Sequence, residues 1–310
     1  MAHNHHHHHD HSNGSHSHEL KNYGSRFFIG ILLNTGFIAA EIIYGLAANS
    51  LALLADAGHN AGDVLGLFMA WGAVILAKRQ PNERYTYGLQ SSTILAALAN
   101  AILLLVACGG IGWEAIQRFS KPEVIGSNIV MVVAAAGIIV NGVTAWLFVS
   151  GSKSDLNMRG AFLHMLADAI VSAGVVAAGA VMMWTGWVWL DPLVSLVISL
   201  VIVFGTWGLL KDSFDLALHA APKHISTAKV KSYLASLDGV KEVHDLHVWA
   251  MSTNETALSA HILIEGKHPG DEFLKTLAHN LEHHFSIGHS TIQIEIGDST
   301  KCKLAPDNVI

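Results

Sequence analysis

The chain has 310 residues, of which 51% are hydrophobic and only 14% are charged, against about 25% charged in a typical soluble domain. This composition argues against an ordinary soluble enzyme, and the net charge of -6 provides no basic field to attract the phosphates of a nucleic acid. The chain nevertheless holds 21 histidines and only two cysteines. We therefore expect imidazole and carboxylate groups to supply the ligands of any metal site.

The first 25 residues are polar and contain nine of the histidines, so residues 1–25 are expected to form a disordered cytosolic tail. No apolar core followed by a cleavage site is present here, and a signal peptide is not expected. Two origins of the histidine run stay open. Its interruption by Asn and Asp favours a native zinc-collecting tail, and the alternative is an expression tag.

Six apolar stretches follow, each close to the ~20 residues that cross a hydrocarbon core about 30 Å thick. They run approximately over Phe27–Leu46, Leu51–Ala77, Leu89–Ile116, Ile125–Val149, Ala161–Trp184 and Pro192–Leu210. The sequence therefore predicts a membrane domain of six transmembrane helices over residues 26–210, with the lipid bilayer as its solvent.

Basic residues are distributed unevenly between the loops. Lys78, Arg79 and Arg84 follow the second stretch, and Lys153 and Arg159 follow the fourth. Because cytoplasmic loops carry the excess of Lys and Arg, both termini are predicted to face the cytoplasm. Near the opposite membrane face, Asp191 precedes Pro192, and this pair predicts an N-cap for the sixth helix.

Charged residues return after residue 210, and the pattern becomes that of a small folded domain. A helix, two strands, a helix and a strand are expected over Thr227–Leu237, Glu242–Ala250, Ala257–Glu265, Gly270–Phe285 and Ser290–Ile296. The strands are predicted from alternating hydrophobicity. This αββαβ order predicts an α+β ferredoxin-like cytosolic domain over residues 211–300, followed by a tail over residues 301–310.

Two membrane helices carry the same four-residue pattern, His-x-x-x-Asp. The second helix has His59 and Asp63, and the fifth has His164 and Asp168. Residues four apart share a helix face, so two facing helices would offer two nitrogens and two oxygens, a ligand set that suits tetrahedral Zn²⁺. Ionisable groups inside a membrane are costly and usually functional. The alternative is that each His and Asp form a structural pair that holds helices together.

With these residues in view, the chain resembles the cation diffusion facilitator family, specifically its bacterial zinc-transporting branch. The resemblance covers residues 20–297 and includes the double His-x-x-x-Asp motif and the segment His244-Asp245-Leu246-His247-Val248-Trp249. It implies that the four membrane residues are the transport site for a divalent cation. It also implies a homodimer and, because the loop after the fourth helix is short, a bacterial inner-membrane protein.

The resemblance also bears on the metal. Relatives with Asp at the first position of the pattern tend to handle manganese, so His59 favours zinc, with cobalt and cadmium as minor substrates. Two carboxylates and two neutral imidazoles carry a charge of -2, which balances Zn²⁺. Protonation of the imidazoles would restore neutrality after release. We therefore expect a zinc/proton antiporter that exports zinc from the cytoplasm.

A second candidate metal site lies in the cytosolic domain, at His244, His247, His261 and Glu295. The resemblance implies a regulatory zinc there, held by His244, His261 and Glu295. His247 is three residues from His244 and would lie on the other face of a regular strand. The alternative is that these are surface histidines that bind no metal.

Two other functions compete with transport. An intramembrane metalloenzyme needs an activated water and a general base, as in His-Glu-x-x-His, and this motif does not occur in the sequence. A metal sensor without transport would need an output element, and nothing resembling a kinase or a DNA-binding element is present. We therefore expect a transporter and not an enzyme.

Overall fold

The computed structural model describes residues 17–149, 156–297 and 302–305. The described residues divide into two compact units, the first lying within the ranges 1–61 and 110–199 and the second within the ranges 62–109 and 200–310. Three of the long helices contribute to both units. Most of the histidine-rich run expected to be a disordered tail lies within residues 1–16, outside the described part of the chain.

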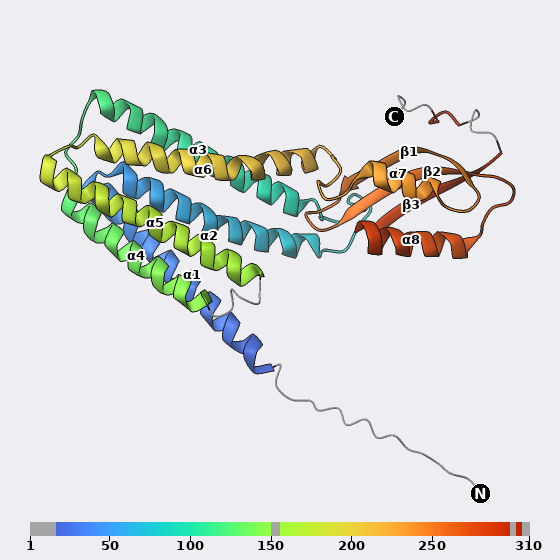
Figure 1. Cartoon of the computed structure of the whole chain (residues 1–310), viewed down its shortest axis with the longest axis horizontal. Helices are drawn as coiled ribbons and strands as arrows, with labels where there is room; N and C mark the ends of the chain where they lie inside the picture. The colour runs from blue at the N-terminus through green and yellow to red at the C-terminus, as the bar shows by residue number, and fades with distance from the viewer. Residues whose placement is uncertain (1–16, 150–155, 298–301, 306–310) are drawn as a thin grey trace, which may run out of the picture. The chain divides into compact units, whose positions relative to one another are not determined.

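Six helices in the described residues are long and apolar enough to cross a membrane, which confirms the expected membrane domain (Figure 1). They are α1 (Ser17–Ala48), α2 (Leu51–Ala77), α3 (Ser92–Ser120), α4 (Ser127–Val149), α5 (Leu156–Thr185) and α6 (Leu190–Ala217).

Two of these helices extend by seven residues or more beyond the stretch that hydropathy predicts. Helix α1 begins at Ser17, before the expected start at Phe27, and α6 continues past Leu210 to Ala217. Hydropathy reports only the part of a helix that lies in lipid, and both helices continue into polar sequence. Helix α6 ends where His219 takes a φ of 63°, and a hydrogen bond from the Ala220 amide to the Asp215 carbonyl closes its last turn, as in a Schellman motif.

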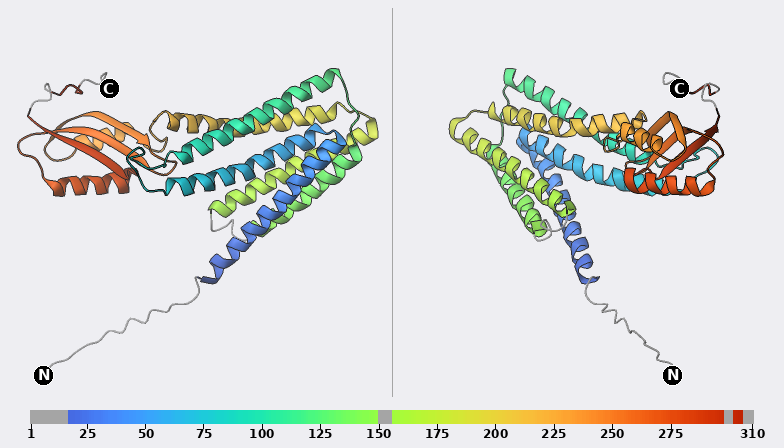
Figure 2. Two further views of the ribbon diagram at one scale, coloured as in Figure 1. Left: turned by 180° about the vertical axis from the view of Figure 1, so that it is seen from behind. Right: turned by 45° about the vertical axis from the view of Figure 1, so that its right-hand side comes forward.

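Within the first unit, α4 packs against both α1 and α5 (Figure 2). Gly137 of α4 makes this packing possible. A Cβ atom at this position would lie 2.6 Å from Cζ of Phe37 and 2.9 Å from Oγ of Ser172. Because such separations are shorter than van der Waals contact, the close approach of the three helices requires a residue without a side chain.

The sequence predicted that Asp191 caps the sixth helix. In the structure, Asp191 instead caps the second helix, α2. Its carboxylate accepts hydrogen bonds from the hydroxyl of Ser50 and from the backbone amide of Leu51, the latter at 2.8 Å. Helix α6 begins one residue earlier, at Leu190. The first amides of any helix lack partners within it, and α2 finds its partner 140 residues away in the chain.

The C-terminal domain has the expected αββαβ order. Its elements are α7 (Thr227–Ala235), β1 (Val240–Ala250), β2 (Thr256–Ile264), α8 (Asp271–Phe285) and β3 (His289–Ile296). The strands form one sheet in the order β1-β2-β3, in which β1 and β2 are antiparallel and β2 and β3 are parallel. Helices α7 and α8 bury apolar residues such as Leu234 and Leu281 against Leu258 and Ile262 of β2. One face of the sheet therefore belongs to the core.

The second unit also contains the loop between α2 and α3, and this loop contacts the C-terminal domain. The Ser91 hydroxyl donates a hydrogen bond to the Met251 carbonyl at 3.2 Å, and the Thr253 amide donates to Oγ1 of Thr93 at 3.1 Å. The rings of Tyr87 and His289 lie 5.5 Å apart, edge to face. Polar and aromatic contacts thus join the start of α3 to the sheet.

Candidate metal centres

The two His-x-x-x-Asp patterns lie on α2 and α5, and their side chains approach one another. Nε2 of His59 lies 3.6 Å from one carboxylate oxygen of Asp168, and Nε2 of His164 lies 3.7 Å from the other. The two imidazole rings are 5.8 Å apart and nearly perpendicular. Asp168, which is only 2% exposed, therefore lies between two imidazoles from different helices.

The fourth predicted residue, Asp63, follows His59 by one turn on the continuous helix α2. One ligand atom each from His59, Asp63 and His164 lie within 4.8 Å of one another. Tetrahedral zinc with bonds of about 2.0–2.1 Å holds neighbouring nitrogen and oxygen ligands about 3.3 Å apart, close to the distances measured around Asp168. Asp168 does not belong to that group of three, although its two oxygens lie 3.6 and 3.7 Å from the two imidazoles.

Further acidic and polar groups are buried beside this cluster in the first unit. Asp56 lies one turn before His59 on α2 and accepts a hydrogen bond from Ser172 of α5 at 3.3 Å. Glu41 of α1 accepts one from the amide of Asn60 at 3.3 Å. Both carboxylates are almost completely buried. Hydrogen bonds from α2 and α5 thus hold two additional carboxyl groups near the four candidate ligands.

The cytosolic cluster gathers residues from all three strands. His244 of β1 pairs with His261 of β2 in the antiparallel ladder. Nε2 of His244 lies 3.3 Å from one oxygen of Glu295 on β3, and Nδ1 of His261 lies 2.9 Å from the other. These three predicted residues therefore meet on the side of the sheet opposite the apolar core.

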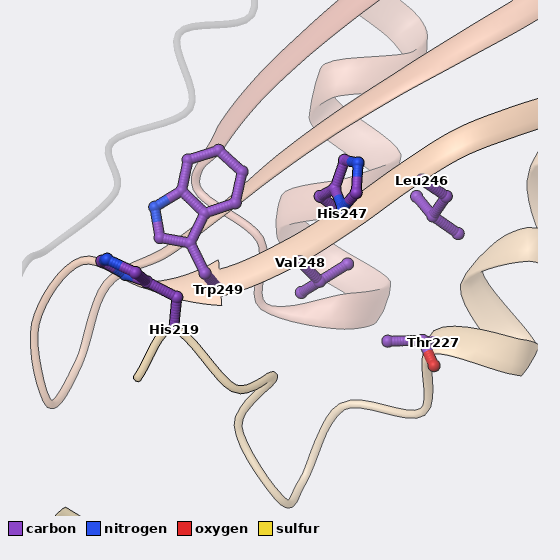
Figure 3. A pocket seen from close by; sticks show the side chains of 6 residues that line it. All are labelled: His219, Thr227, Leu246, His247, Val248 and Trp249. Atoms are coloured by element: carbon purple, nitrogen blue, oxygen red, sulfur yellow. The ribbon is translucent and has the colours of Figure 1, made fainter. Parts of the chain in front are cut away.

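His247 is not part of this cluster. A bulge between His244 and His247 inserts one extra residue into β1, so that His247 pairs with Ser259, two residues from His261. The expectation that His247 faces the other side of the strand from His244 is therefore wrong, because it assumed a regular strand, and paired residues share a face. His247 instead contacts Asp245 at 2.8 Å and lines a pocket near Trp249 and His219 (Figure 3).

Cys302, which the sequence analysis did not consider as a ligand, joins the cytosolic cluster. Its sulfur lies 3.6 Å from Nδ1 of His261, and one ligand atom each from Cys302, His244, His261 and Glu295 lie within 4.8 Å of one another. The only signal in the sequence was its position seven residues after Glu295. Its proximity to the histidines depends on the fold.

The pKa values of this cluster reflect these contacts. Burial raises the pKa of Glu295, but a hydrogen bond with the Cys302 thiol and the neighbouring His244 outweigh it, so the pKa lies below its ordinary value. The same hydrogen bond raises the pKa of Cys302. Without metal, the carboxylate is therefore ionised at neutral pH and the thiol keeps its proton.

Comparison with known proteins identifies the class of the molecule. Residues 27–216 match the model of the cation efflux transmembrane domain, and residues 222–296 match the cytoplasmic domain of cation efflux proteins. The chain belongs to the cation diffusion facilitator family. It is a divalent cation efflux transporter and not an enzyme, as the sequence predicted.

The sequence similarity to individual relatives extends over most of the length of each protein. The chain is 37% identical over 276 residues to the zinc transporter ZitB of Escherichia coli, covering 88% of each chain. It is 34% identical over 272 residues to the cadmium, cobalt and zinc/H(+)-K(+) antiporter of Bacillus subtilis, covering 86% of this chain and 87% of that protein.

Two further similarities involve CzcD. The chain is 36% identical over 269 residues to the metal cation efflux system protein CzcD of Cupriavidus metallidurans, covering 86% of this chain and 85% of CzcD. A solved structure of the metal-bound C-terminal domain of CzcD from the same organism is 35% identical. This alignment covers 23% of the present chain and 99% of that domain, with a TM-score of 0.22.

Proposed function

We propose that the protein exports Zn²⁺ from the cytoplasm in exchange for protons, through a site formed by His59, Asp63, His164 and Asp168. The observation that carries the proposal is the position of the buried Asp168 carboxylate, which lies within 3.7 Å of imidazoles from two different helices. Four protein ligands would complete a tetrahedral shell, which suits a carried ion better than the activated water of a metalloenzyme.

The exchange for protons follows from the charge of the ligand set. Two carboxylates and two neutral imidazoles carry -2, equal and opposite to Zn²⁺. Once the cation has left, that charge would remain in a poorly solvated site, so protonation of the imidazoles is favoured. Metal binding and protonation compete for the same nitrogens. A proton gradient therefore drives the cation outward as the site alternates between the two sides of the membrane.

The ligand types favour zinc among the divalent cations. Imidazole nitrogens suit zinc, and carboxylates alone suit magnesium or manganese. The relatives named for zinc, cadmium and cobalt support the same group of metals, and we propose cobalt and cadmium as minor substrates. One relative is named for potassium as well as protons, so potassium is the counter-ion to compare with the proton.

The remaining parts of the proposal concern setting and assembly. We propose a bacterial inner-membrane protein with both termini in the cytoplasm, supported by the basic residues that follow α2 and by the match of residues 222–296 to a cytoplasmic domain. A homodimer is proposed from the same family match. We further propose a regulatory zinc at His244, His261 and Glu295, whose side chains meet across the sheet.

Transport in inside-out membrane vesicles tests the central proposal. Zinc uptake is expected when the lumen is made acidic, and a protonophore should abolish it. A potassium gradient imposed in place of the pH gradient should not drive zinc uptake. The Asp63→Asn variant should lose uptake, and the matched control Glu83→Gln, in an exposed loop, should keep it. Uptake that ignores the pH gradient would refute antiport with protons, and Asp63→Asn vesicles with normal uptake would refute the site.

A further inference from the structure

The face of the sheet opposite the apolar core carries the cytosolic cluster. Val243 and Ile262 belong to the core, and the residues next to them, His244 and His261, point to the other face because side chains alternate along a strand. Glu295 pairs in register with Leu263, two residues after His261, and therefore shares this face. Three adjacent strands thus present two imidazoles and one carboxylate side by side.

The distances within the cluster are those of a metal site that needs little rearrangement. Zinc bonds of about 2.3 Å to sulfur and 2.0–2.1 Å to nitrogen place tetrahedral sulfur and nitrogen ligands about 3.6 Å apart. The Cys302 sulfur lies 3.6 Å from Nδ1 of His261. The oxygens of Glu295 lie 2.9 and 3.3 Å from the two imidazoles, near the separation expected for nitrogen and oxygen ligands.

A second observation points independently to a missing ligand. His244 is only 2% exposed, and neither of its ring nitrogens makes a hydrogen bond within the described residues. Buried polar atoms are rarely left in this state, because each lost hydrogen bond costs free energy. The Nε2 atom points at Glu295 inside the cluster. A bound cation would satisfy this nitrogen.

Carboxylates outside the cluster lie near the other ring nitrogen of each imidazole. Glu242 lies 3.6 Å from Nδ1 of His244, which leaves Nε2 to the cluster. Asp245 lies 3.5 Å from Nε2 of His261, which leaves Nδ1 to the cluster. Histidines that ligate metals commonly pair their other nitrogen with a carboxylate, and this fixes the ring and raises the basicity of the ligand.

We propose that Cys302 is the fourth ligand of a closed tetrahedral zinc site with His244, His261 and Glu295. The inference deepens the regulatory part of the proposed function, and it rests on that part for the role of the metal but not for the ligands. Four protein ligands leave no open position, as in structural zinc sites. A thiolate favours zinc and cadmium over magnesium and manganese, and it gives its proton to solvent when the metal binds.

With Cys302 as the fourth ligand, the metal would connect parts of the chain that three ligands on the sheet would not connect. Three of the ligands belong to the sheet, whereas Cys302 lies beyond the end of β3. Zinc bound by all four would therefore attach the segment after β3 to strands β1 and β2. A metal ion bound at this site would therefore connect two parts of the cytosolic domain.

Cadmium binding to the full-length protein in detergent tests this assignment. An Asp63→Ala, Asp168→Ala background removes the membrane site, so that transport is not needed for any readout. Cadmium should give a sulfur-to-metal charge-transfer absorption in the near ultraviolet. Cys302→Ser should abolish this band and weaken binding by more than about tenfold, and the matched control Cys108→Ser should change neither. Cadmium bound without the band, or with a band that survives Cys302→Ser, would overturn the proposal.

Protection from alkylation gives a second readout that uses zinc itself. In the Cys108→Ser background Cys302 is the only thiol. Added zinc should slow its reaction with a maleimide, and the protection should disappear when His244→Ala is added. Equal labelling with and without zinc would overturn the assignment. Neither result depends on proton exchange, so failure of this site and failure of the transport proposal are distinguishable.

Discussion

A single carboxylate connects the two halves of the proposed transport site. Asp168 faces both imidazoles, and it is the most deeply buried of the four candidate ligands. A negative charge in such a place is stable only with a cation or a protonated partner nearby. In the proposed site, Asp168 is therefore the carboxylate whose charge depends most on the bound cation or on the protonated imidazoles.

Replacing Asp168 with Asn keeps the shape of the side chain and removes its charge. We expect zinc uptake by inside-out vesicles to fall to the level of vesicles without the protein, because one ligand and half of the compensating charge are lost. Glu114→Gln is the matched control, since Glu114 is half exposed on α3 and pairs with Arg118. Uptake above one tenth of the wild-type rate in Asp168→Asn, or equal loss in the control, would contradict this role.

Asp191 allows a second prediction for a single residue. Its carboxylate accepts hydrogen bonds from Ser50 and Leu51 at the start of α2. Removing a helix cap typically costs about 0.5–2 kcal/mol, so Asp191→Ala should lower the midpoint of thermal unfolding in detergent. Glu83→Ala, which changes an exposed loop residue, should leave the midpoint within error. An unchanged midpoint in Asp191→Ala would show that the cap does not contribute to stability.

At the scale of elements, the packing of α2 against α3 in the second unit depends on small residues. A Cβ atom at Gly66 would lie 2.7 Å from the amide nitrogen of Asn100. Such a short separation forces a neighbour to move, whereas a Cβ atom at Gly72 of the same helix would meet nothing within 4 Å. The two glycines lie on the same helix and differ only in the atoms that surround them.

The same substitution at these two glycines therefore compares a crowded position with an open one. Gly66→Leu should overpack the α2–α3 contact, with a cost of about 1–3 kcal/mol, and should lower the thermal midpoint in detergent. Gly72→Leu should be neutral or stabilising, because leucine favours a helix more than glycine does. A larger loss in Gly72→Leu than in Gly66→Leu would refute the described packing.

The elements also show what could be predicted from the sequence. Helix α2 was predicted at both ends, and the pairing of His59 with Asp63 followed from helical spacing alone. The cap by Asp191 and the ligand position of Cys302 were not predicted, because both depend on contacts between distant parts of the chain. The bulge in β1 was missed for another reason: alternating hydrophobicity assumes a regular strand.

For the whole molecule, the contact between the start of α3 and the turn between β1 and β2 joins a membrane helix to the cytosolic domain. The Thr253 amide donates to the Thr93 hydroxyl. A Thr93→Val variant keeps the shape and removes the acceptor. Because a hydrogen bond contributes about 0.5–1.5 kcal/mol, amide exchange at Thr253 should become roughly two- to tenfold faster.

Thr185→Val is the matched control for that measurement, because the Thr185 hydroxyl donates within its own helix, to the Val181 carbonyl. Hydrogen–deuterium exchange with mass spectrometry measures both variants. Exchange at Thr253 that is unchanged in Thr93→Val would show that the start of α3 does not hold the turn between β1 and β2.

Strand β3 has a different neighbour at each end. It begins at His289, whose ring meets Tyr87 of the α2–α3 loop, and it carries Glu295 six residues later. At about 3.3 Å per residue, these two positions are about 20 Å apart along a strand that is paired throughout with β2. One continuously paired strand therefore carries both a ligand of the cytosolic metal cluster and the residue that contacts the α2–α3 loop.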